Sequence, residues 1–296
     1  RAMSTQKHTD EISGVETTGH EWDGIKELNN PLPKWWIYTF YVCILWSIAY
    51  WVVFPAWPYF TSGGWKHTAG SFGYTQRGEV SAELQKVAEG RAVFLKQIDA
   101  MPIEDIAKNE NLMEVALAGG RATFADNCAP CHGSGAQGGN GFPNLNDDDW
   151  LWGGTLSDIQ TTVTHGIRWE ADADTRQNMM PRFLDDSMLK ADQINDVAEY
   201  VLSLSNKADD AAAAKRGAEV FAANCVACHG ADAKGNQQLG APNLTDAIWL
   251  YGGDKATIVQ TVSHGRGGVM PAWGTRLSGS TIKELALYVH SLGGGK

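Results

Sequence analysis

The motif Cys128-Ala129-Pro130-Cys131-His132 decides how this chain is interpreted, and it returns later as Cys225-Val226-Ala227-Cys228-His229. The spacing Cys-x-x-Cys-His is the attachment signature of c-type haem. The two thiols of each motif can form thioether bonds to one porphyrin edge, and the adjacent histidine can supply an axial imidazole to the iron. Four of the five cysteines are used in this way, which leaves only Cys43. The sequence therefore predicts two covalently bound haem c groups.

A structural zinc site is the alternative, because four thiolates can bind one zinc ion. Only the haem interpretation predicts a second axial ligand downstream of each motif, usually methionine in electron-transfer cytochromes. Met180-Pro181 follows the first motif and Met270-Pro271 follows the second. We therefore expect His132 with Met180, and His229 with Met270, as the axial pairs. Met179 competes with Met180, and the proline shared by the two motifs favours Met180.

Length and charge narrow the functional classes. The chain has 296 residues, of which 43% are apolar and 20% are charged, enough for two ordinary domains plus further segments. Its net charge of -10 argues against a nucleic-acid partner, which requires basic patches. An acidic protein can attract a basic partner such as a soluble cytochrome.

An uncharged apolar run covers residues 35–54. At about 1.5 Å per residue, twenty helical residues span about 30 Å, the hydrocarbon thickness of a bilayer. Tryptophan and tyrosine lie at both ends, as in interfacial aromatic belts: Trp35, Trp36, Trp57 and Tyr59. We predict a single transmembrane helix within residues 35–57 and no buried core helix. Haem c is attached outside the bacterial cytoplasm, so we expect residues 1–34 to be cytoplasmic and everything after the helix to be periplasmic.

Residues 58–110 are predicted to form a periplasmic linker. Residues 60–78 are rich in Gly, Ser and Thr and are expected to be a loop. Apolar residues at helical spacing then predict an amphipathic helix over residues 80–100, a short helix over 103–107 and another helix from residue 112.

The rest of the chain is an internal repeat. Strings around both haem motifs match in order, and each copy ends in an amphipathic helix. The first copy has a longer loop before its methionine, at residues 169–178. We predict two homologous domains, residues 111–206 and residues 207–296.

Each copy resembles the class I cytochrome c fold, in which the first and last helices cross and a glycine allows their close approach. The resemblance places Gly120 and Gly217 at these crossings. It implies that Phe124 packs near Tyr200, and that Phe221 packs near Tyr288. It also implies that the carbonyls of Pro143 and Pro242 hold the free ring nitrogens of His132 and His229. The expected fold class is all-α: one transmembrane helix followed by two class I cytochrome c domains.

Two further pairs of residues recur near the methionines. His165 and His264 are alternative axial ligands, or loop residues near a haem edge. Arg168 and Arg266 are candidates to pair with haem propionates, since guanidinium suits carboxylate, or else are surface residues. Six-coordinate iron has no open position for substrate, so we expect electron transfer and assign no catalytic residue.

The order of segments is similar to that of the dihaem subunit of cbb3-type cytochrome c oxidases, the CcoP/FixP family. The resemblance runs nearly end to end and rests on strings such as His20-Glu21-Trp22-Asp23-Gly24-Ile25, Asn30-Pro31-Leu32-Pro33-Lys34-Trp35-Trp36 and Gly268-Val269-Met270-Pro271-Ala272-Trp273. It implies an inner-membrane subunit that receives electrons from a c-type cytochrome donor. It also implies transfer by way of a monohaem cytochrome c subunit to a catalytic subunit that reduces oxygen to water.

Other classes stay open. A free-standing, membrane-anchored dihaem carrier would shuttle electrons alone. A cytochrome subunit of a periplasmic dehydrogenase usually has three haem motifs, and this chain has two. A haem peroxidase would need one haem that loses its sixth ligand.

Overall fold

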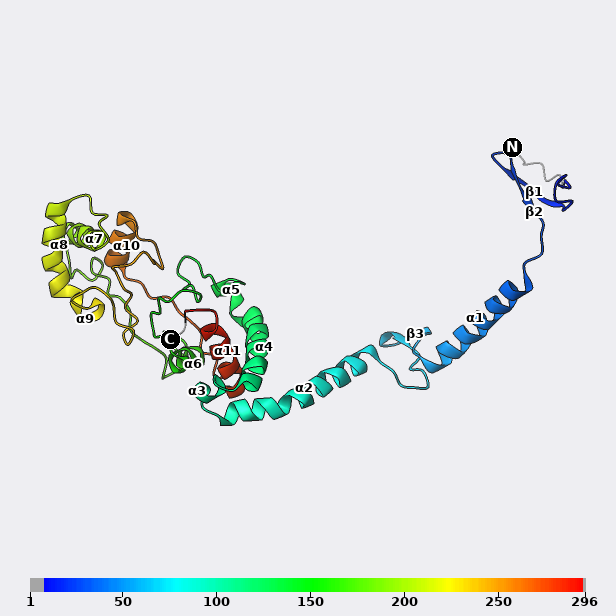
Figure 1. The fold of residues 1–296 in the computed structure, drawn as a ribbon, viewed down its shortest axis with the longest axis horizontal. Helices are drawn as coiled ribbons and strands as arrows, with labels where there is room; N and C mark the ends of the chain where they lie inside the picture. Colours follow the sequence, from blue (N-terminus) through cyan, green and yellow to red (C-terminus); the bar gives the residue numbers. More distant parts are fainter. Residues whose placement is uncertain (1–7, 295–296) are drawn as a thin grey trace. The chain divides into compact units, whose positions relative to one another are not determined.

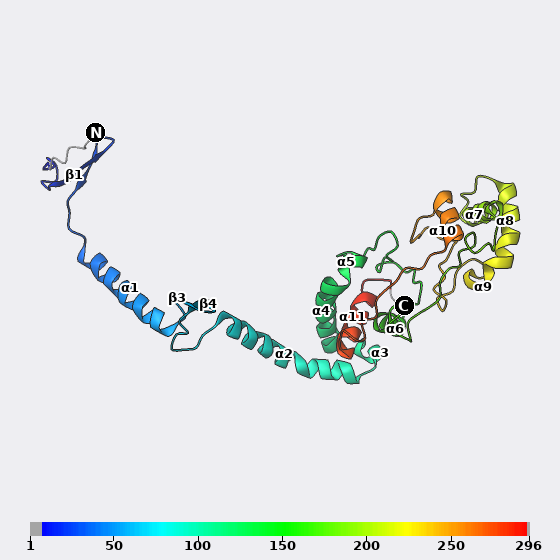
Figure 2. The same cartoon turned by 180° about the vertical axis from the view of Figure 1, so that it is seen from behind.

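The structure is a computed structural model that describes residues 8–294 (Figures 1 and 2). The chain divides into two compact units, residues 1–88 and residues 89–296, and each is described by itself. Residues 1–7 of the predicted N-terminal segment and residues 295–296 of the second predicted domain lie outside the described part.

The first unit contains α1 (Lys34–Val53), which coincides with the predicted membrane span. Within residues 8–294 it is the one helix long and apolar enough to cross a membrane, with a mean hydropathy of 1.6. None of its residues is buried by the rest of the protein. A helix this apolar and this uncovered requires lipid or another apolar helix around it.

Two small hairpins flank α1. β1 (Thr17–Trp22) pairs antiparallel with β2 (Ile25–Leu28), and β3 (Pro58–Thr61) pairs antiparallel with β4 (Gly64–His67). The expectation of a purely helical chain therefore needs correction, as does the expectation that residues 60–78 are all loop. Asp23 and Gly24 both have positive φ, as a two-residue hairpin turn requires, so Asp-Gly between two β-prone stretches was the available signal.

The helix α2 (Gln76–Ala100) leads into the second unit. Its C-terminal half contacts α11 (Gly279–His290) through two side chains, Arg91 of α2 and Lys283 of α11. Arg91 Nη2 lies 3.1 Å from Glu284 Oε1, and Lys283 Nζ donates to the carbonyls of Ile98, Asp99 and Met101 at 3.1, 2.8 and 2.8 Å. Because Ile98 is also fully buried, this end of α2 belongs to a core of the second unit rather than to a free linker.

The other helices of the second unit follow in order: α3 (Ile103–Ile106), α4 (Glu110–Asn127), α5 (Ala129–His132), α6 (Leu156–His165), α7 (Ala191–Ser203), α8 (Ala211–Asn224), α9 (Val226–His229), α10 (Lys255–His264) and α11 (Gly279–His290).

The two repeats exchange their last helices. α4 and α6 of the first repeat pack on α11 of the second repeat, and α8 and α10 of the second repeat pack on α7 of the first. Figures 1 and 2 both show α11 beside α4 and α7 beside α8. We call the cluster around Phe124, Ile159 and Leu285 the first core, and the cluster around Phe221, Ile258 and Val197 the second core.

The aromatic contacts follow the exchange. The ring centroids of Phe124 and Tyr288 lie 5.5 Å apart, and those of Tyr200 and Phe221 lie 5.0 Å apart. The prediction that Phe124 packs near Tyr200, and Phe221 near Tyr288, is therefore wrong. The side chains are the right ones, but each phenylalanine meets the tyrosine of the other repeat.

A short connection explains the exchange. Only residues 204–210 separate α7 from α8, so these neighbours in sequence form a helical hairpin. The buried carboxylate of Glu199 holds this connection, since it accepts from the backbone N–H of Asp209 at 3.0 Å and of Asp210 at 3.3 Å and contacts Lys255 Nζ at 2.5 Å. With α7 engaged by α8, the similar helix α11 packs on α4.

Glycines do lie where the helices cross. A Cβ at Gly120 would lie 2.2 Å from the carbonyl oxygen of Glu284, and one at Gly217 would lie 2.0 Å from that of Asp196. Any side chain larger than hydrogen would push the helices apart. The predicted role of Gly120 and Gly217 is confirmed, but each crossing joins helices of different repeats.

Candidate haem sites

Each Cys-x-x-Cys-His motif forms one helical turn directly after a core helix. In the first, the backbone N–H groups of Cys131 and His132 donate to the carbonyl of Cys128 at 3.1 and 2.9 Å. The second repeats this geometry at 3.1 and 2.9 Å around Cys225. Positions i, i+3 and i+4 of a helical turn lie on one face, so both thiols and the imidazole face the same side.

The histidines are held as the cytochrome resemblance implies. His132 Nδ1 lies 3.1 Å from the carbonyl oxygen of Pro143, and His229 Nδ1 lies 3.0 Å from that of Pro242. Such a bond places the proton on Nδ1 and leaves Nε2 to bind a metal. Burial lowers the pKa of both imidazoles, partly offset by the proline carbonyl, and so favours the neutral form that binds iron.

The thiols do not form one zinc cluster. Cys128 packs against the first core and Cys225 against the second. Burial, with a smaller contribution from the neighbouring cysteine of each motif, raises the pKa of Cys128 and of Cys225 to about 11. Among the described residues, the one group of His, Cys, Asp and Glu side chains close enough to share a metal ion is His165, Asp172 and Asp174, which contains no cysteine.

A cavity of about 470 Å³ marks the second site. Its walls include Cys225, Cys228 and His229 from the second repeat and Met180 from the first. Most of the remaining lining is apolar: Phe183, Val197, Val201, Phe221, Leu244, Trp249, Ile258 and Val262. Two thiols, an imidazole and a thioether around an apolar cavity fit the donor set and the environment of haem c.

The methionine that packs on the first core also belongs to the other repeat. Met270 packs against the core that contains Phe124 and Cys128. Its backbone pairs with Ile167, with Ile167 N to Met270 O at 2.9 Å and Met270 N to Ile167 O at 3.0 Å. We expected His132 to pair with Met180, and His229 to pair with Met270. The packing instead places Met270 on the first core and Met180 on the second core.

Matching backbone contacts fix both methionine segments. Trp273, three residues after Met270, donates to the carbonyl of Val163 at 3.1 Å, and Phe183, three residues after Met180, donates to that of Val262 at 3.1 Å. Each methionine segment of one repeat thus lies on the helix end of the other, α6 or α10.

The two candidate methionines of the first repeat differ in packing. Met180 contacts the second core, whereas Met179 is 56% exposed. Met179 also borders the cavity, and a Cβ at Gly267 would lie 2.5 Å from its sulfur. Packing agrees with the choice of Met180 made from the shared proline.

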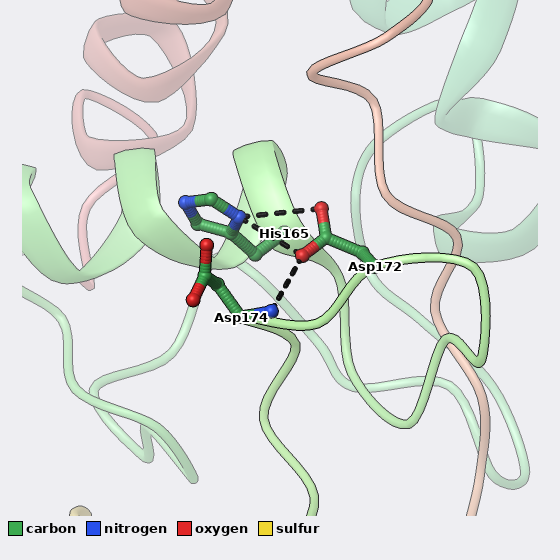
Figure 3. Close-up of side chains that lie close together, drawn as sticks. All are labelled: His165, Asp172 and Asp174. Carbon is green, nitrogen blue, oxygen red and sulfur yellow. Dashed lines mark hydrogen bonds and ion pairs between the residues drawn. The ribbon is translucent and has the colours of Figure 1, made fainter.

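Carboxylates hold the two alternative histidine ligands. His165 Nδ1 lies 3.2 Å from each carboxylate oxygen of Asp172, beside Asp174 (Figure 3). His264 Nδ1 lies 3.0 and 3.1 Å from the oxygens of Asp185. These contacts bind the Nδ1 atoms of both histidines to loop carboxylates.

The two predicted arginines have different surroundings. Arg168 Nε donates to the carbonyl of Gly268 at 2.6 Å, and its Nη1 donates to that of Asn178 at 2.5 Å. The guanidinium of Arg266 lies over the ring of Tyr251, 4.5 Å from its centroid. Both arginines border the cavity at the second site. Arg176, which lies in the longer loop of the first repeat, was not singled out from the sequence. Its surroundings match those of Arg266.

Three family models match the chain. The N-terminal domain of cytochrome oxidase-cbb3, FixP, matches residues 14–61, cytochrome c matches residues 117–205, and cytochrome c oxidase, cbb3-type, subunit III, matches residues 212–289.

Full-length relatives give the same result. The chain is 57% identical to the cbb3-type cytochrome c oxidase subunit FixP of Azorhizobium caulinodans, over 97% of this chain and 96% of the relative. It is 56% identical to the subunit CcoP of Azospirillum brasilense, over 98% and 99%. It is 53% identical to the subunit FixP of Bradyrhizobium diazoefficiens, over 99% and 100%.

Proposed function

The chain belongs to the FixP/CcoP family of cbb3-type cytochrome c oxidase subunits, and on this basis we propose that it delivers electrons to the catalytic subunit of such an oxidase. Two covalently bound haem c groups are its cofactors, one for each Cys-x-x-Cys-His motif. A haem c with histidine and methionine ligands exchanges one electron at its iron. The relatives' names favour an oxidase subunit over a free-standing carrier or a dehydrogenase subunit.

The residues of the chain attach, orient and enclose these groups. We propose that Cys128 and Cys131 attach the first haem, with His132 and Met270 as axial ligands. Cys225 and Cys228 attach the second, with His229 and Met180 as axial ligands. Pro143 and Pro242 accept the Nδ1–H of the two histidines. Each half is then a class I cytochrome c fold that the other repeat completes.

The membrane anchor and the partners complete the proposal. α1 anchors the chain in the inner membrane, with the N-terminal segment in the cytoplasm and both haem domains in the periplasm. Electrons come from a c-type cytochrome donor and pass by way of a monohaem cytochrome c subunit to the catalytic subunit. The acidic composition of the chain, with a net charge of -10, suits a basic donor.

The observation that carries this proposal is the repeated set of two thiols, one proline-held histidine and one core-packed methionine. A reduced-minus-oxidised spectrum of the complex purified in detergent, with haem quantified by type, tests it. We expect haem b together with haem c, and oxygen consumption from a reduced cytochrome donor. Haem c alone, at two per chain and without oxygen consumption, would establish a free-standing carrier instead.

A further inference from the structure

Arg176 and Arg266 have matching environments although their positions in the repeat do not match. Arg176 Nε donates to Thr162 Oγ1 at 3.1 Å, and Arg266 Nε donates to Thr261 Oγ1 at 3.1 Å. These threonines hold the same place in α6 and α10. The two guanidinium groups therefore contact equivalent helices at the same point.

Each guanidinium also lies over an aromatic ring. Arg176 Cζ lies 5.3 Å from the centroid of Trp152, and Arg266 Cζ lies 4.5 Å from that of Tyr251. Trp152 and Tyr251 hold the third place in the repeated strings Trp-Leu-Trp-Gly-Gly and Trp-Leu-Tyr-Gly-Gly. The two guanidinium groups therefore also contact aromatic rings at equivalent positions of the repeat.

The two arginines come from different positions in their repeats. Arg266 directly follows His264-Gly265, and its carbonyl accepts from Met180 N at 3.4 Å. The first repeat has Ile167 at that position, paired with Met270 on one side and with Arg176 on the other. Ile167 is uncharged. Arg176, in the longer loop of the first repeat, therefore supplies the positive charge that Arg266 supplies in the second repeat.

At the second site, the surroundings of Arg266 show which groups its positive charge faces. Arg266, Tyr251 and Thr261 border the cavity that also contains His229 and Met180. Among the residues that the structure describes, no carboxylate forms an ion pair with Arg266, whereas Arg176 has Asp158 at 3.7 Å. A partly buried guanidinium that borders this cavity without an ion-pair partner favours a carboxylate ligand.

We propose that Arg176 and Arg266 are equivalent positioning residues, one for each haem, which face the haem carboxylates and raise the reduction potential. Arg176, not Arg168, is then the counterpart of Arg266. A fixed positive charge near the iron disfavours the oxidised, more positive state, so its removal lowers the potential. This inference rests on the proposed haem sites.

Redox titration of the purified haem-loaded complex, followed at the haem c absorption band, tests the proposal. We expect Arg266→Gln to shift the reduction equilibrium of one haem c by about tenfold, which is 59 mV for one electron. Arg176→Gln should shift the other haem c in the same direction and by less, because Asp158 already offsets its charge. Arg176→Lys should retain most of the wild-type potential, because it retains the charge.

One variant is a control with unchanged haem content, and a second variant tests a competing assignment. Arg121→Gln removes a charge from an exposed position on α4 and should shift neither haem. Arg168→Gln tests the competing assignment. The proposal is overturned if Arg176→Gln and Arg266→Gln shift the same haem or neither, or if Arg168→Gln reproduces the shift expected of Arg176→Gln. Absence of oxygen consumption by the unmodified complex would reject the oxidase role and leave these potentials measurable.

Discussion

At the scale of residues, each site combines a locally fixed group with a distant one. The cysteines and histidine lie within one helical turn, and the proline that holds the histidine follows 11 residues later in the first site and 13 residues later in the second. Sequence spacing predicts this part because all its members are close in the chain. The methionine comes from a distant segment, so its partner depends on how the helices pack, which spacing alone does not determine.

Met180 and Met179 are distinguished by packing, and this can be tested. We expect Met180→Leu to abolish the Met–Fe(III) charge-transfer absorption of the second haem, because Met180 packs in the second core. Met179→Leu should retain that absorption, because the Met179 side chain is 56% exposed. Both substitutions replace thioether by a hydrocarbon of similar volume, so each serves as the control for the other. Loss of the band in Met179→Leu alone would reverse the assignment.

The lowered pKa of Glu199 predicts that the stability of the second core depends on pH. Its hydrogen bond to Lys255 is the largest of the effects that lower the pKa of this carboxyl below the usual 4.5. Because the folded-state pKa lies below the unfolded value, the stabilisation is complete above about pH 4.5 and is lost as pH falls through the folded-state pKa. We expect the free energy of unfolding to fall with acidification in this range, and to fall less steeply in Glu199→Gln.

Lys255→Gln provides the control for Glu199. It removes the same hydrogen bond from the other side, so its pH profile should also be shallower than that of the wild type. Denaturant unfolding of the haem-loaded chain at several pH values measures both profiles. A wild-type slope in Glu199→Gln would show that this carboxyl does not carry the effect.

At the scale of elements, the two helix crossings depend on glycine. A Cβ at Gly217 would lie 2.0 Å from the carbonyl oxygen of Asp196, and this backbone has no flexible end that can move aside. We expect Gly217→Ala to reduce the free energy of unfolding by about 1–3 kcal/mol, as overpacking of a tight contact does.

Gly90 provides a matched control for Gly217. It lies inside α2, and a Cβ there would meet nothing within 4 Å. Gly90→Ala should therefore stabilise the chain by up to about 1 kcal/mol, because alanine favours the helix. Denaturant unfolding of both variants measures the difference, and equal effects would show that the crossing at Gly217 is not tight.

The elements were largely predictable from sequence, and their exceptions have physical causes. Apolar periodicity predicted α7 and α11 because these helices bury one face in a core. It also predicted α2, although Ile98 is the one residue of this helix that is buried. The hairpins β1–β2 and β3–β4 were missed because they are short and largely exposed, so they leave no apolar alternation. The Asp23-Gly24 turn was the one local signal for the first hairpin.

At the scale of the whole molecule, the exchange of α7 and α11 could not be read from the repeat. Two homologous copies offer nearly the same surfaces, so α4 can pack on α7 or on α11 with similar side chains. The sequence does contain a hint in the short connection at residues 204–210, which favours a hairpin of α7 and α8. The cytochrome c model matches the first repeat and the cbb3-type subunit III model matches the second, and a sequence match does not distinguish the two pairings.

The exchange predicts how the chain behaves when this connection is cut. A protease site inserted within residues 204–210 should yield two fragments that stay associated, because each core contains helices from both. Size-exclusion chromatography after cleavage, with haem absorption recorded, measures the association. The same protease site placed in residues 8–16, outside both cores, is the control. Separation of the fragments as two folded haem proteins would show that each repeat folds alone.

The most direct test of the account asks which methionine binds the haem attached at Cys225 and Cys228. Replacement of Cys128 and Cys131 by serine leaves this haem as the single haem c of the chain. In that background we expect Met180→Leu to abolish the Met–Fe(III) charge-transfer band and Met270→Leu to retain it. A band that disappears with Met270→Leu and persists with Met180→Leu would show that each haem takes its methionine from its own repeat, and would contradict the exchanged sites.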